Sequence, residues 1–237
     1  ALLTRLLAPP GLVVVLMGPD GAGKTTVGDA YCQRMASTFY PEVQRRFHWR
    51  PRLLPAPSSL LRRGPDAEAD ATDPHGKPAR GTVSSAMRLI YFLLDYWLGS
   101  WLRVKPVTAR MGLALFDRFS HDVLIDPLRY RLGLPPWLLH WFVRVTPVPD
   151  LVFILDAPAS VLLNRKREIT EAEIDRQRQA LAKMAASQAN THVIEVDKPV
   201  ATIVDQMEVL TLQFLDRRSR RRLGWAPANA MTALVKG

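Results

Sequence analysis

Short, fully apolar runs alternate with longer amphipathic segments along this chain. The run Leu12–Met17 is continuous and rich in valine, as expected of a strand that is buried on both faces of a parallel sheet. Because similar runs recur between helical segments, the pattern predicts right-handed crossovers and an α/β fold of three layers, a parallel sheet flanked by helices. The five predicted strands are residues 12–17, 43–47, 113–116, 151–155 and 192–196.

Helical periodicity is clearest between residues 84 and 104, where large apolar residues recur at helical spacing. This face is expected to lie in the core or in a dimer interface. Asp95 interrupts it, so its carboxylate is expected either in a ligand cleft or beside an arginine. The apolar residues are Met87, Ile90, Tyr91, Leu94, Trp97, Leu98 and Trp101.

Five other helices are predicted. The first follows the glycine-rich loop and ends near residue 37, the next three span residues 135–145, 160–167 and 171–187, and the last begins at Pro199.

The chain has 237 residues, enough for one sizeable core, and its composition does not shift before the last 20 residues. We therefore expect a single domain over residues 1–217. Residues 55–82 are rich in Pro, Ala, Gly and charge and lack periodicity, which predicts a mobile insertion. Residues 218–237 are expected to form a basic C-terminal tail.

Lysines and arginines number 32 against 22 acidic residues, a net charge of +10, and the arginine-rich run at residues 217–222 supplies five of these charges. No aromatic interleaving or groove-reading motif accompanies this charge, so a specific nucleic-acid partner is not expected. Peripheral membrane contact through the tail is the less favoured alternative. The single cysteine, Cys32, excludes a disulfide framework and fits a reducing, cytoplasmic setting.

A phosphate-binding loop follows the first predicted strand. Its glycines allow backbone N–H groups to surround phosphate oxygens, and the next helix adds a favourable partial charge. Lys24 is expected to reach the β- and γ-phosphates and Thr25 to ligate Mg²⁺. The motif therefore predicts binding of ATP or GTP with Mg²⁺. It comprises Gly18, Pro19, Asp20, Gly21, Ala22, Gly23, Lys24 and Thr25, with Thr26 beside it.

The spelling of this loop resembles that of thymidylate kinases, within the nucleoside monophosphate kinases. Three further segments resemble motifs of that family: Asp117-Arg118-Phe119 after the third strand, Pro149-Asp150-Leu151 with Leu155-Asp156, and Asn164-Arg165-Lys166-Arg167. The resemblance covers about residues 12–217. It implies a P-loop kinase fold, ATP as the phosphoryl donor, Mg²⁺, a possible homodimer and a lid at residues 164–180.

The resemblance also implies roles for individual residues. Asp20 is expected to contact the acceptor. Asp117 is expected to hold the Mg²⁺ shell or an acceptor oxygen, and Arg118 to grip the acceptor phosphate. Arg165 and Arg167 are expected to close over the transferring phosphoryl group. On the acceptor side we expect Arg50 as a second clamp, Trp49 as a stacking surface and Asp95 in the cleft.

The acceptor segments depart from the family. The chain has His48-Trp49-Arg50-Pro51 in place of an Arg-Glu-Pro-Gly-Gly-like segment, and residues 120–130 replace the segment that helps to hold thymine. Asp122 and Asp126, in this stretch, are expected to be solvated.

The first interpretation is phosphoryl transfer from ATP to a nucleoside monophosphate, dTMP first. Two alternatives remain open. One is a kinase of the same fold acting on a nucleoside, a sugar or a cell-surface glycan. The other is a catalytically altered nucleotide-binding assembly or membrane-surface protein.

Overall fold

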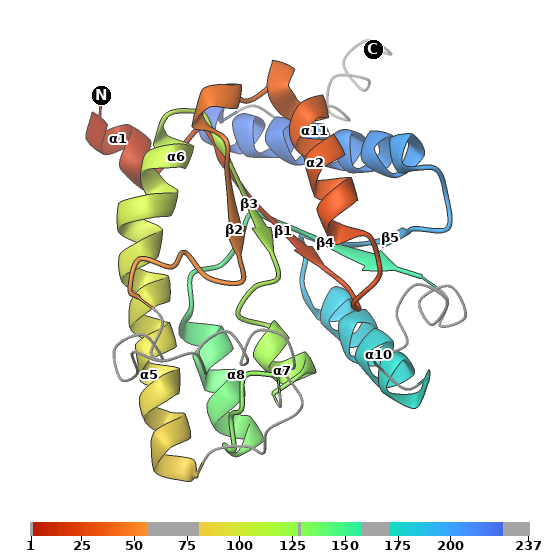
Figure 1. Ribbon diagram of the computed structural model, residues 1–237. Helices are drawn as coiled ribbons and strands as arrows, with labels where there is room; N and C mark the ends of the chain where they lie inside the picture. The colour runs from red at the N-terminus through yellow and green to blue at the C-terminus, as the bar shows by residue number, and fades with distance from the viewer. Residues whose placement is uncertain (1, 56–80, 128, 158–170, 225–237) are drawn as a thin grey trace, which may run out of the picture.

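The computed structural model describes residues 2–55, 81–127, 129–157 and 171–224. Five parallel strands form one sheet in the order β2-β3-β1-β4-β5 (Figure 1). The sheet and its flanking helices confirm the predicted fold class. The strands are β1 (Leu12–Met17), β2 (Arg45–His48), β3 (Leu113–Asp117), β4 (Leu151–Asp156) and β5 (Thr191–Glu195).

Helices cover both faces of the sheet (Figure 1). On one face, α2 (Lys24–Arg34) packs with α11 (Val200–Leu223), and the hydroxyl groups of Tyr31 and Thr211 lie 2.8 Å apart between them. On the other face lie α5 (Thr82–Gly99), α7 (Asp122–Ile125), α8 (Pro136–Val145) and α10 (Glu171–Ser187). Shorter elements are α1 (Leu2–Leu7), α6 (Lys105–Ala109), the 3₁₀ turns η1 (Met35–Ser37) and η2 (Pro41–Val43), and the π-turn η3 (Ser100–Val104).

The topology places several polar residues at one edge of the sheet. Strand β1 is central, pairing with β3 on one side and β4 on the other. The carboxyl ends of all five strands meet at one edge because the strands are parallel. Asp117 and Asp156 end β3 and β4 beside the loop that follows β1. In sheets of this kind ligands bind outside the carboxyl ends, where the direction of the connections reverses.

Two predicted boundaries are wrong for local reasons. Strand β2 begins at Arg45 rather than at residue 43, because Pro41 opens a 3₁₀ turn that includes Val43. The long helix does not stop at Val104: η3 continues it into α6. Pro106 lies in the first turn of α6, where its missing N–H costs no helical hydrogen bond.

The predicted apolar face of α5 is not part of this chain's core. The residues of α5 that pack inward are instead Leu89, Phe92 and Tyr96. Met87, Ile90, Leu94, Trp97, Leu98 and Trp101 are all exposed, and Val83 and Leu102 extend the same surface. Exposed apolar residues gathered on one surface are typical of interaction sites. None of the described helices has the length and apolar character required to cross a bilayer.

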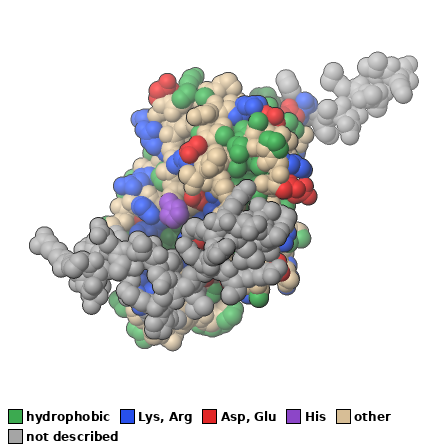
Figure 2. Space-filling model, turned by 45° about the vertical axis from the view of Figure 1, so that its right-hand side comes forward, with side chains coloured by type: hydrophobic (Ala, Val, Ile, Leu, Met, Phe, Trp, Pro, Cys, Tyr) green, Lys and Arg blue, Asp and Glu red, His purple; other side chains and the backbone are tan. Residues whose placement is uncertain are grey.

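The arginine-rich run at residues 217–222 lies at the end of a helix, so the first residues of the expected tail are helical. Helix α11 continues through it to Leu223, and Gly224 ends the helix in a left-handed conformation with φ 68°. Arg218 donates hydrogen bonds to the carbonyl oxygens of Gly11 at 2.9 Å and Pro10 at 2.6 Å, just before β1. Elsewhere, Lys and Arg side chains occur in several places on one face, with Asp and Glu side chains among them (Figure 2). The remainder of the expected tail, residues 225–237, lies outside the described residues.

Candidate functional site: a phosphate loop beside an ion-pair network

The loop between β1 and α2 has the backbone that phosphate binding requires. Gly18 has φ 145° and approaches β4 so closely that a Cβ there would lie 2.5 Å from the carbonyl oxygen of Leu155. Gly23 precedes α2 with φ 81°, and a Cβ built on it would meet no atom within 4 Å. Gly23 therefore borders open space at the amino end of a helix, as a phosphate cradle requires.

Lys24 is held inside this loop. Its side chain is only 8% exposed, and its ammonium group donates hydrogen bonds to the carbonyl oxygens of Gly18 at 2.9 Å and Pro19 at 2.8 Å. Burial, followed by the nearby Arg118 guanidinium, lowers the pKa of Lys24 to about 8. A phosphate group at this position would favour the charged ammonium again. Thr25 and Thr26 are exposed at the start of α2, so the Thr25 hydroxyl group is accessible to a cation.

Asp20 links the loop to arginines from two distant segments. One carboxylate oxygen pairs with Arg118, and the other accepts a hydrogen bond from Arg129 at 2.8 Å. Burial of Asp20 opposes its ionisation, but Arg118 and Arg129 outweigh that effect and hold its pKa well below its usual range. The carboxylate is therefore ionised at neutral pH. It fixes the phosphate loop against the residues that follow β3.

Asp122 lies on the far side of Arg118 and is buried, so the prediction that it is solvated is wrong. It accepts hydrogen bonds from Arg118 at 2.8 Å and from the Tyr130 hydroxyl at 2.6 Å. Asp126, also predicted to be solvated, is likewise buried, and one of its carboxylate oxygens accepts a hydrogen bond from the Arg129 amide at 3.1 Å. Both carboxylates can be buried because each accepts a hydrogen bond from the protein, which offsets the loss of hydration.

Asp117 ends β3 and is partly buried. Its Oδ1 atom is buried and has no hydrogen-bond partner among the described residues, while Oδ2 lies 3.7 Å from His48 Nδ1. Burial opposes its ionisation, but His48 and Lys24 nevertheless lower the pKa of Asp117. A partly buried, ionised carboxylate beside a phosphate loop suits a cation shell or an acceptor hydroxyl. The residues that follow β2 and β3, Trp49 and Arg118, have positive φ, a backbone strain found often at functional sites.

The acceptor-side residues are partnered within the protein. Arg50 pairs with Asp95 at 2.8 Å, and Asp95, which is 0% exposed, also accepts hydrogen bonds from the backbone amides of Arg52 and Leu54. Of the two positions expected for Asp95, the structure shows the one beside an arginine. Trp49 is buried, and its ring stacks on Tyr130 at 4.1 Å between centroids. Neither the Trp49 ring nor the Arg50 side chain is exposed to solvent.

Asp156, at the end of β4, receives two hydrogen bonds from Arg178 of α10, at 2.6 and 2.9 Å. Arg178 belongs to the part of the expected lid region that the structure describes. The expected lid residues Arg165 and Arg167, and the predicted helix at 160–167, lie outside the described residues, as does most of segment 55–82.

No protein-family model matches the chain. The thymidylate kinase of Xanthomonas campestris pv. campestris strain B100 is 24% identical over 226 residues, which cover 92% of this chain and 90% of the relative. The thymidylate kinase of strain 8004 matches equally. The crystal structure of thymidylate kinase from Ehrlichia chaffeensis superposes with a TM-score of 0.58 at 17% identity, covering 86% of this chain and all of that one. The chain is therefore similar, at low sequence identity, to thymidylate kinases over most of its length.

The site contains residues that sequence reasoning missed. Arg129, Tyr130 and Asp122 were not predicted to belong to it. A local signal existed only for Asp122, which follows Arg118 by four residues, the spacing of a helical ion pair. Arg129 is 109 residues from Asp20, and no local pattern joins them.

Proposed function

We propose that this protein is an ATP-dependent phosphotransferase that moves the γ-phosphoryl group of ATP to a nucleoside monophosphate, with dTMP as the first acceptor. The observation that carries the proposal is the loop–Asp20–Arg118 arrangement in a chain whose full-length relatives are named thymidylate kinases. Phosphoryl transfer requires mainly in-line positioning and neutralisation of negative charge, and this edge of the sheet supplies several cations beside a glycine-lined cradle.

The residues of the site suggest a division of roles. The backbone of residues 18–23 and Lys24 would hold the polyphosphate of ATP. Thr25 and the unpartnered Oδ1 of Asp117 would hold Mg²⁺, directly or through water, and the cation would offset charge on the phosphates. Arg118, fixed by Asp20 and Asp122, would position the acceptor phosphate. Arg165 and Arg167 remain proposed lid residues, within a lid at 164–180.

One observation on the acceptor side favours a second candidate. Arg50 and Trp49 are committed to Asp95 and Tyr130, so the side of the site that would recognise a base differs from the expected open arrangement. A kinase of the same fold that phosphorylates a nucleoside, a sugar or a glycan would use the same phosphate loop with a different acceptor side.

ADP release with Mg²⁺–ATP across an acceptor panel tests the proposal. The panel contains dTMP, the other nucleoside monophosphates, nucleosides and simple sugars. We expect dTMP to give the highest kcat/KM. Turnover with a nucleoside or sugar alone would establish the second candidate. ATP binding without acceptor-dependent ADP release for any member would contradict phosphotransfer and favour a nucleotide-binding assembly or membrane-surface role.

We further propose that the protein forms a homodimer through α5. Five of its exposed residues alternate at intervals of three and four, the spacing of a helix–helix seam: Met87, Ile90, Leu94, Trp97 and Trp101. Two copies related by a twofold axis would cover this surface isologously. The proposed setting is the cytoplasm, with residues 1–217 as one kinase domain.

Leu94→Glu is expected to convert a dimer of wild-type protein into a monomer, because it places a charge at the centre of the seam. Light scattering after size exclusion measures the mass. The control is Val209→Glu, which alters an exposed apolar residue of α11 and should leave the mass unchanged. A wild-type monomer at all concentrations would contradict the dimer.

A further inference from the structure

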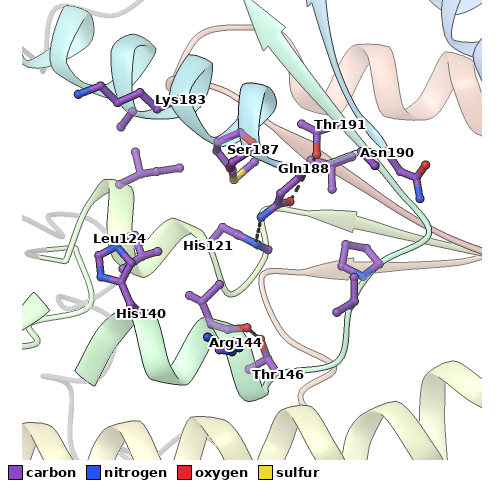
Figure 3. Close-up of a pocket in the computed structure, with 18 of the residues that line it drawn as sticks. His121, Leu124, His140, Arg144, Thr146, Lys183, Ser187, Gln188, Asn190 and Thr191 are labelled. Carbon is purple, nitrogen blue, oxygen red and sulfur yellow. Dashed lines mark hydrogen bonds between the residues drawn. The ribbon is translucent and has the colours of Figure 1, made fainter. Parts of the chain in front are cut away.

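A pocket of about 930 Å³ lies away from the phosphate loop, and the proposed phosphotransfer does not use it. Its walls are α8 and α10, which face one another, with α7 at one end (Figure 3). At its other end lie residues 147–149 and 188–191, which lead into the amino ends of β4 and β5. The phosphate loop follows the carboxyl end of β1, at the opposite edge of the sheet. The volume falls within the range of small-molecule sites.

The inner part of the pocket is apolar. Residues from three helices and β4 form this part, so a ligand would bury hydrocarbon or aromatic surface there. The apolar side chains are Leu124, Ile125, Val143, Val152, Ala180 and Met184.

Two cations stand at the rim on opposite walls. Arg144 comes from α8 and Lys183 from α10, and both side chains are exposed (Figure 3). None of the described residues that line the pocket is acidic, and neither cation pairs with a carboxylate among them. Elsewhere in the protein Arg118, Arg176 and Arg178 all have acidic partners. The rim therefore favours a negatively charged group from outside the protein.

A buried polar side chain lies at the α7 end. His121 is 8% exposed; Gln188 donates to its Nε2 atom at 2.8 Å, while its Nδ1 atom is buried without a partner among the described residues. Burial lowers the pKa of His121 to about 4, so the ring is neutral at pH 7. The Nδ1 atom of His121 is thus a polar atom in the pocket wall with no hydrogen bond to the described residues. Because this ring is neutral, the positive charge at the pocket comes from Arg144 and Lys183 at the rim.

We propose that this pocket is a second small-molecule site, which binds a free amphipathic anion: an organic acid with an apolar body and a single carboxylate, sulfonate or phosphate. The apolar body lies among the side chains from α7, α8 and α10, and the anionic group lies at the rim, where Arg144 and Lys183 supply positive charge. The site is independent of the phosphotransferase assignment, because it shares no residue with the phosphate loop.

Decanoate is a suitable probe, with decanol as its uncharged counterpart, and calorimetry on the full chain measures both. We expect decanoate to bind at a single site per chain and decanol to bind about tenfold more weakly, since only the acid can pair with the rim. Lys183→Gln and Arg144→Gln should each weaken decanoate binding by up to about tenfold. Lys198→Gln, on an exposed residue outside the pocket, should leave it unchanged.

Two tryptophan variants distinguish decanoate binding in this pocket from binding to the exposed face of α5. Ala180→Trp places an indole in the pocket and should abolish decanoate binding, whereas Ala182→Trp, two residues away on the same helix but outside the lining, should not. Equal binding by these two variants, or no decanoate binding by the wild type, would overturn the site. Equal binding of decanol and decanoate would overturn its anion selectivity. The two rim variants remain decisive if Ala180→Trp does not fold.

Discussion

Lys24→Ala is expected to lower kcat/KM for ADP formation about 10³-fold, the loss typical of removing one preorganised donor to a developing charge. Lys24 is the buried cation of the phosphate loop, and its ammonium group lies against the carbonyl oxygens of Gly18 and Pro19. In the proposed reaction it would exchange these carbonyls for phosphate oxygens, and alanine supplies no charge in its place.

The fold should survive this substitution, because the two carbonyl oxygens that Lys24 leaves behind can be hydrated from the open side of the loop. Urea denaturation should therefore give nearly the wild-type midpoint. Lys198→Ala removes an exposed lysine and serves as the control for the loss of one positive charge. Turnover of the Lys24→Ala protein at the wild-type rate would refute the role assigned to the loop.

Asp95→Ala is expected to lower the free energy of unfolding by about 3–5 kcal/mol, the cost of leaving a buried charge without its partner. Asp95 pairs with Arg50, and it accepts hydrogen bonds from the amides of Arg52 at 3.0 Å and Leu54 at 2.6 Å. The substitution removes all three interactions at once. Residues 50–54 then lose their hydrogen bonds and ion pair with α5.

Urea denaturation followed by circular dichroism measures the effect. Asp95→Asn retains an acceptor oxygen but not the charge, so its loss should be smaller than that of alanine. Asp216→Ala breaks an ion pair on the surface of α11 and should barely move the midpoint. An Asp95→Ala protein as stable as the wild type, with a raised acceptor KM, would instead place Asp95 in substrate binding.

The fold was predictable from sequence because its signals are local. The apolar run of β1, the glycine pattern after it and the alternation of strands with helices each lie within a short stretch of chain. Local signals were weakest at the ends of elements. The long helix was predicted to end at residue 104, but the π-turn η3 continues it into α6.

The site was predictable only in part, for the same reason. The phosphate loop and Asp117-Arg118 belong to short motifs. The Asp20–Arg129 pair and the Trp49–Tyr130 stack join residues separated by 80 or more positions, and no periodicity reports such contacts. The orientation of α5 also escaped prediction. When a helix has apolar residues on two faces, its sequence does not show which face packs against the core. In α5 the buried face contains Leu89, Phe92 and Tyr96.

The central position of β1 also has a consequence for the order of events during synthesis. This strand is made before its neighbours: β3 and β4 follow about 100 and 140 residues later, and Arg218, which binds the segment before β1, follows later still. Contacts so distant in sequence form slowly. While the ribosome is still translating the middle of the chain, an apolar strand and an unsupported phosphate loop are already exposed. A growing chain of this design therefore depends on protection from aggregation until α11 has emerged and can close over α2.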